Sequence, residues 1–157
     1  MDADRIAERL MEGTERFGIN EEERAFNLLA SFQLVELSLK IYIGIANDVI
    51  SSRVSEIIAF NPDSRALEKA SLERLLAMFK VVNGNRSLQK RLAALVDKRN
   101  DVAHRMLLPH FGLVRRGSDY RRVHEELKKT EESLNRVMKS LAKEIVSIKK
   151  RCAHAEG

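Results

Sequence analysis

Apolar and polar residues alternate with a helical period along most of the chain. The period is clearest in the last third, which predicts one long helix over about 118–152, capped by Ser118. Its apolar positions recur at three- and four-residue steps, at Tyr120, Val123, Leu127, Thr130, Leu134, Val137, Leu141, Ile145, Ile148 and Cys152. Such a seam could pack inside a helical bundle or against a partner chain.

The same period predicts a helix over about 87–108, with Ser87 as its N-cap. Leu88, Leu92 and Leu95 lie on one face of it. Pro109 ends this helix, because the residue before a proline avoids helical conformation. The connector 109–117 is expected to be extended or a short hairpin.

Three further helices are expected upstream. The first covers 3–17. The second begins after the N-cap Asn20 and runs to about residue 60, where Asn61-Pro62 ends it. The third covers 65–82.

These elements predict an all-α fold, an up-and-down bundle of four to five helices in a single domain over 1–157. The composition agrees, since two Pro and seven Gly leave long helices uninterrupted and only 5% of residues are aromatic.

Charge and cysteine content indicate which partners and which compartment are compatible with the sequence. The net charge of +5 is compatible with a polyanionic partner, although basic and acidic residues alternate along most of the chain. A single cysteine, Cys152, excludes an internal disulfide and favours a reducing compartment. No signal peptide is evident at the start of the sequence, so a cytoplasmic location is expected. The most apolar stretch, 34–50, contains Glu36, Lys40 and Asp48 and is expected to fall short of a membrane span.

The sequence holds no phosphate-binding glycine loop, paired-cysteine motif or His-Glu-x-x-His motif. The candidate chemistry lies in the helix 87–108, where four residues separate Arg99 from His104 and Asn100 follows the arginine. Five steps of an ideal α-helix leave Arg99 and His104 about 140° apart, whereas Asn100 and His104 share a face. Arg99 continues the apolar stripe, from which a long guanidinium can reach an anion.

This motif resembles the signature of the HEPN superfamily, an Arg followed after four to six residues by a His, often with Asn or Asp after the Arg. Glu36 and Lys40 resemble the polar pair on an earlier helix of that family. The specific match covers about ten residues, 95–104, and a second Arg-to-His spacing, from Arg105 to His110, lacks the asparagine and is interrupted by Pro109.

The resemblance implies a metal-independent endoribonuclease of a toxin or phage-defence type, without a cofactor. The resemblance also implies a homodimer whose two motifs line one cleft. His104 is the implied general acid or base, Arg99 the phosphate clamp, and Asn100 the residue that orients either group. In the implied reaction, the 2′-OH of RNA attacks the adjacent phosphorus, the 5′-oxygen leaves as a free 5′-OH, and a 2′,3′-cyclic phosphate is formed. A cognate antitoxin or regulatory protein is a possible partner, but Met106 replaces a tyrosine common in toxins paired with a nucleotidyltransferase.

Structural interpretations stay open for each of these residues. Arg99 could simply pair with Glu36, and Glu36 with Lys40 could form only a surface ion pair. His104 could be a cation at a helix end, and Asn100 an ordinary exposed residue. Four arginines near the last helix could bind RNA phosphates or only solubilise the chain: Arg115, Arg116, Arg121 and Arg122. The alternative functions are a non-catalytic HEPN-like RNA- or protein-binding module and a purely structural dimeric bundle.

Overall fold

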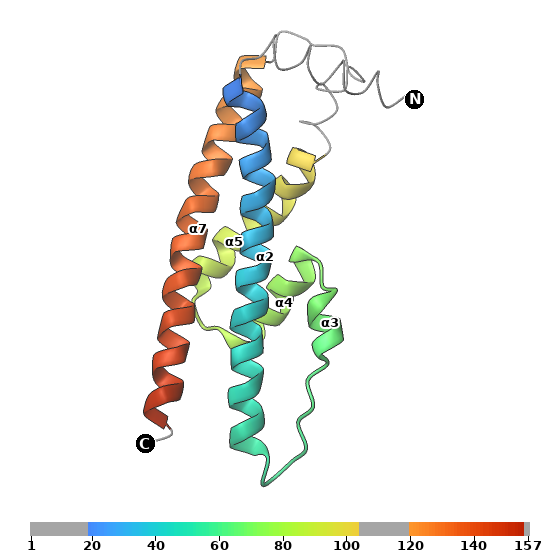
Figure 1. The fold of residues 1–157 in the computed structure, drawn as a ribbon, viewed down its shortest axis with the longest axis vertical. Coiled ribbons are helices and arrows are strands. Elements are labelled where there is room, and N and C mark those ends of the chain that lie inside the picture. The colour runs from blue at the N-terminus through green and yellow to red at the C-terminus, as the bar shows by residue number, and fades with distance from the viewer. Residues whose placement is uncertain (1–18, 104–119, 156–157) are drawn as a thin grey trace.

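Two helices of 36 residues each, α2 (Ile19–Val54) and α7 (Tyr120–Ala155), form the long axis of the computed structural model. The structure describes residues 19–103 and 120–155. The two helices pack side by side and run in the same direction (Figure 1). At 1.5 Å per residue, each is about 54 Å long.

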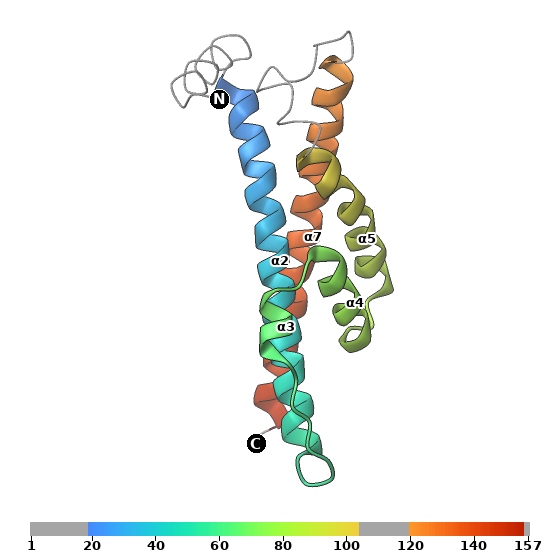
Figure 2. The same cartoon turned by 90° about the vertical axis from the view of Figure 1, so that its right-hand side faces the viewer.

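Three shorter helices connect them: α3 (Ser64–Glu68), α4 (Leu72–Val82) and α5 (Arg86–Asp101). Figure 2 shows α4 and α5 against one side of the long pair. Helix α4 packs on α2 and α5, and α5 packs on α7, so α2, α4, α5 and α7 form a closed ring. The described residues contain five helices and no strand, which confirms an all-α bundle.

The connectivity departs from the strict up-and-down order that the sequence suggested. Helices α2, α4 and α7 run in one direction and α5 runs in the other (Figures 1 and 2). The reason is the connection 55–71, which contains α3 and carries the chain back along α2 before α4 begins. One long crossover of this kind is a known variation of helical bundles.

The core is built by one apolar face from each helix of the ring. On α7, the predicted seam is buried inside the bundle from Leu127 to Leu141, against the other helices. This part of the seam is therefore used within the chain. The other large side chains that are fully buried are Leu28, Phe32, Val35, Leu39 and Ile43 on α2, Leu75 and Phe79 on α4, and Leu88, Leu92 and Leu95 on α5.

The second helix ends earlier than the sequence predicted, at Val54 rather than near residue 60. The amides of Ile57 and Ile58 both donate to the Val54 carbonyl, at 2.9 and 2.8 Å, and close a turn. Ile57 is 87% exposed and Ile58 62% exposed. No packing therefore supports another helical turn here.

The predicted helix over 65–82 is two helices. Asp63 accepts from the Ala66 amide and caps α3, and Ser71 accepts from the Arg74 amide and caps α4. Between them, the chain turns at Lys69. The periodicity did not show this break because both halves carry apolar residues at helical spacing.

The fourth predicted helix begins with a different cap. Asn85, not Ser87, caps α5, since its Oδ1 accepts from the Leu88 amide at 3.1 Å. Its Nδ2 donates to Glu144 of α7 at 2.7 Å. The same carboxylate accepts from buried Asn83, which also donates to the Tyr42 hydroxyl, each at 3.0 Å. These hydrogen bonds join the α4–α5 turn to both long helices.

Helix α2 is more apolar than its charged residues suggested. By length and composition, Phe26–Val54 is apolar enough to cross a membrane, with a mean hydropathy of 1.5. Judged by length and composition alone, this stretch does not fall short of a span as expected, since an 18-residue window of it holds at most two charged residues. A core helix of a soluble protein meets the same measure, and α2 buries one face against α4 and α7.

Several expected features lie outside the described residues. They are the helix over 3–17, the connector 109–117, the N-cap Ser118, and the part of the motif helix that follows Ala103.

Candidate active site

Helix α5 brings Arg99 to the surface at the C-terminal end of a buried stripe. Leu88, Leu92 and Leu95 are at most 1% exposed, and they fix the rotation of the helix about its axis. Arg99 lies one turn beyond Leu95 on the same side, yet its side chain is 47% exposed. The guanidinium therefore reaches solvent from the apolar stripe, as its long side chain permits.

Arg99 contacts the carboxylate of Glu36, which the sequence analysis assigned to the same candidate site. The distance from its Nη2 to Oε1 of Glu36 is 3.6 Å, and Glu36 is 20% exposed. Val35, beside Glu36 on α2, is fully buried. The structural interpretation of Arg99, pairing with Glu36, thus describes a real contact. An ion pair this exposed stabilises a fold by only about 0–1 kcal/mol, so it leaves Arg99 available to an anion.

The chain changes its helical geometry directly before the candidate histidine. The α-helix ends at Asp101, and Val102 and Ala103 continue in a wider π-helical turn. Val102 is 4% exposed and anchors this turn in the core. π-turns occur often at functional sites. His104 itself lies outside the described residues.

The other two motif residues have different surroundings. Asn100 is exposed at the end of α5. Lys40 lies one turn beyond Glu36 on α2, and its Nζ donates to the Glu68 carbonyl at 2.6 Å. Lys40 thus holds the end of α3 against α2, whereas Glu36 contacts Arg99. Among the described residues, the site consists of Arg99, Glu36 and Asn100, and Lys40 has a structural role beside it.

The two predicted arginine pairs stay predictions. Arg115 and Arg116 lie outside the described residues, and Arg121 and Arg122 belong to the first turn of α7 with side chains that are not described. Over 19–103 and 120–155, no group of three or more His, Cys, Asp or Glu could hold a metal ion.

Sequence reasoning missed three cations that the fold brings together. Arg91 and Lys98 of α5 and Arg136 of α7 line one groove between these helices. The seven-residue spacing of Arg91 and Lys98 places them on one helix face, which is a signal that the sequence does carry. Their proximity to Arg136 depends on the packing of α5 against α7, and the sequence alone does not give that.

No family model, no curated protein and no solved structure matches this chain. The chemistry of the described residues and the resemblance of a short motif are therefore the indications of function. In the structure, Arg99 and Asn100 of this motif lie at an exposed helix end, and Arg99 contacts a carboxylate from a neighbouring helix.

Proposed function

We propose that this chain is a metal-independent endoribonuclease of the HEPN type, acting as a symmetric dimer in the cytoplasm. The observation that carries the proposal is the position of Arg99. Its guanidinium, at the end of the buried stripe of α5, is 47% exposed, contacts Glu36 at 3.6 Å and lies just before the π-helical turn at Val102 and Ala103. Such a cation can hold a phosphate without leaving the core stripe that positions it.

In the proposed reaction, the ribose 2′-OH attacks the neighbouring phosphorus while the bond from phosphorus to the 5′-oxygen breaks. The products are a 2′,3′-cyclic phosphate and a free 5′-OH. Arg99 binds the non-bridging oxygens, on which negative charge increases. His104 transfers a proton, since imidazole titrates near neutral pH. Asn100 orients His104 or the phosphate.

An exposed apolar stripe on α2 supports the dimer. Leu34, Leu37 and Ile41 are 52%, 53% and 42% exposed and recur at helical spacing. Glu36 lies between them in sequence and contacts Arg99. A second copy that docks on this stripe about a two-fold axis therefore brings two copies of Arg99 toward one interface.

Replacing Arg99 and Glu36 one at a time tests whether Arg99 acts in catalysis or only stabilises the fold. We expect Arg99→Ala to lower kcat/KM for RNA by about 100-fold or more, as does loss of a group that stabilises transition-state charge. Glu36→Gln removes only an exposed ion pair of at most about 1 kcal/mol and is expected to lower kcat/KM by about five-fold or less.

The measurement is the initial rate of cleavage of a labelled RNA, with Arg74→Ala on α4 as the matched control. Arg74 is exposed and lies on another helix. Equal, small losses in the Arg99 and Glu36 variants would contradict the proposal and leave Arg99 as a structural residue.

A charge on the α2 stripe should convert a dimer into monomers. We expect Leu37→Glu to halve the mass measured by light scattering, because each two-fold interface would bury two unpaired carboxylates. Val81→Glu is the control, since Val81 is 84% exposed on α4 and lies off the stripe. A parent that is monomeric at all concentrations, or a Leu37→Glu variant that stays dimeric, would refute this interface.

A second candidate function is a non-catalytic RNA-binding module, which the three groove cations favour. It predicts RNA retention without cleavage. A toxin or defence role with a cognate antitoxin or regulatory protein belongs to the first proposal only.

A further inference from the structure

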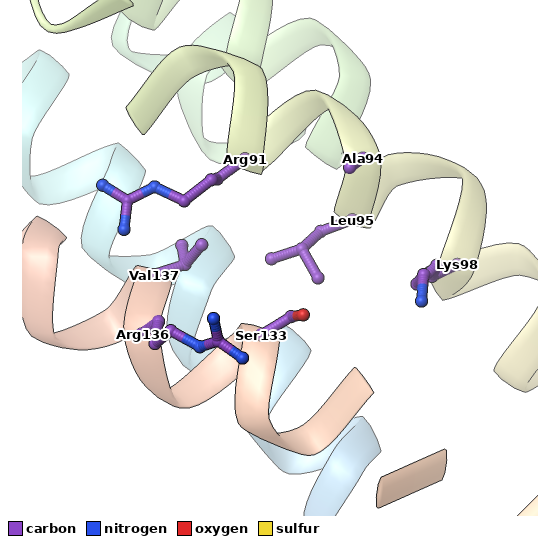
Figure 3. Close-up of a pocket in the computed structure, with 7 residues that line it drawn as sticks. All are labelled: Arg91, Ala94, Leu95, Lys98, Ser133, Arg136 and Val137. Atoms are coloured by element: carbon purple, nitrogen blue, oxygen red, sulfur yellow. The ribbon is translucent and has the colours of Figure 1, made fainter. Parts of the chain in front are cut away.

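A groove between α5 and α7 combines an apolar floor with three cations. Figure 3 shows Arg91, Ala94, Leu95 and Lys98 on α5 facing Ser133, Arg136 and Val137 on α7. Leu95 and Val137 belong to the core and lie between the charged side chains. None of the residues that line the groove is acidic.

The cations of the groove are only weakly engaged elsewhere. Arg136 pairs with Glu132 at 3.6 Å, but the two side chains are 68% and 55% exposed, so the pair is weak. Nε of Arg91 donates to the Ser87 carbonyl at 3.4 Å, close to the limit for a hydrogen bond. Lys98 is half-buried, and its side chain has neither an ion pair nor a hydrogen bond with the described residues.

Three like charges around one groove repel each other, and an anion between them removes that repulsion. The groove therefore favours an anionic ligand over an apolar one. Its volume of about 150 Å³ lies below the roughly 300–1,000 Å³ of pockets that enclose drug-sized molecules. It consequently accommodates part of a long anion rather than a whole small one.

We propose that this groove binds the backbone of single-stranded RNA next to the candidate active site, an inference that rests on the proposed function. Arg91 and Lys98 are about 10 Å apart along the α5 axis and are placed to contact phosphates. Planar guanidinium groups also stack on unpaired bases, and the apolar floor accepts a base edge. Lys98 directly precedes Arg99, so RNA in the groove continues toward the motif.

The test is binding of a labelled single-stranded RNA to the full chain in EDTA, measured by fluorescence anisotropy over a range of salt concentrations. The groove variant is Arg91→Gln/Lys98→Gln/Arg136→Gln. The control variant, Arg65→Gln/Arg74→Gln/Lys80→Gln, removes two arginines and one lysine from α3 and α4, where all three are exposed. Both variants lose the same net charge.

The groove variant is expected to bind RNA about ten-fold more weakly or worse, and its slope of log affinity against log salt should fall by about 2. The control should keep both the affinity and the slope of the parent within about two-fold, because distant exposed charges are screened. Circular dichroism verifies that each variant is folded.

The outcomes separate the two proposals. Equal RNA binding by the groove and control variants overturns the groove inference and leaves the ribonuclease proposal standing. If the parent protein binds RNA through the groove but does not cleave it, the groove inference is supported and the ribonuclease proposal is overturned. Binding of the parent to vesicles of anionic phospholipid, but not to RNA, overturns both.

Discussion

His104→Ala is expected to abolish most RNA cleavage while leaving the fold intact. A positioned general acid or base contributes about 100- to 10,000-fold to a rate, so kcat should fall by at least 100-fold. Arg99 and the groove cations remain in this variant, and RNA binding should therefore stay within about two-fold of the parent. The measurement is a single-turnover rate at saturating RNA, together with the dissociation constant.

Two other histidines give matched controls. His124→Ala and His154→Ala remove the same side chain at positions to which no role is assigned. Both should cleave RNA at the parental rate. If all three variants lose activity equally, or if His104→Ala cleaves as the parent does, His104 is not the acid–base residue and the motif does not form the active site.

Phe79→Ala is expected to lower the free energy of unfolding by about 3–5 kcal/mol. Phe79 is fully buried on α4, and its ring meets Tyr42 of α2 in an edge-to-face contact with centroids 5.0 Å apart. Truncation leaves a cavity where α4, α5 and α2 meet, and it also loses the aromatic pair. Since whole domains are stable by only about 5–15 kcal/mol, this change is large.

Urea denaturation followed by circular dichroism measures the effect. Val81→Ala on the same helix is the control and should change stability by less than about 0.5 kcal/mol, because Val81 is 84% exposed. If Phe79→Ala does not fold, Phe79→Leu should still fold, with a loss of about 1 kcal/mol or more. A loss below about 0.5 kcal/mol in Phe79→Ala would show that α4 does not contribute to the core as described.

The last helix shows how far a periodic pattern can predict this fold. The seam from Leu127 to Leu141 was predicted as a continuous apolar face, and it is buried over that length. The stripe of α5 through Leu88, Leu92 and Leu95 was predicted equally well. Both helices carry polar residues on their other faces. Their sequences therefore predict which face is buried as well as the presence of a helix.

Helix α2 shows the limit of the same argument. Apolar residues lie all around it, so its periodicity does not indicate which face is buried. Phe26, Leu37 and Ile41 are exposed, whereas Leu28, Val35 and Leu39 form the core. The choice depends on α4 and α7, which pack against α2 from distant parts of the chain.

The candidate site divides in a similar way. The motif spacing identified Arg99 and Asn100, and the pairing of Arg99 with Glu36 was foreseen as one alternative. Two features are not predictable from the sequence. They are the hydrogen bond from Lys40 to the end of α3 and the proximity of Arg136 to Arg91 and Lys98. Each of these contacts joins residues that are far apart in sequence. Residue type and hydrophobic periodicity do not predict such contacts.

The central claim is tested most directly by incubating mixed RNA with the purified full chain in EDTA and analysing the ends of the products. The proposal predicts fragments that end in 2′,3′-cyclic phosphate and begin with 5′-OH, formed by the parent protein and not by His104→Ala. Intact RNA after incubation with folded, dimeric parent protein, or fragments that end in 3′-OH, would contradict it.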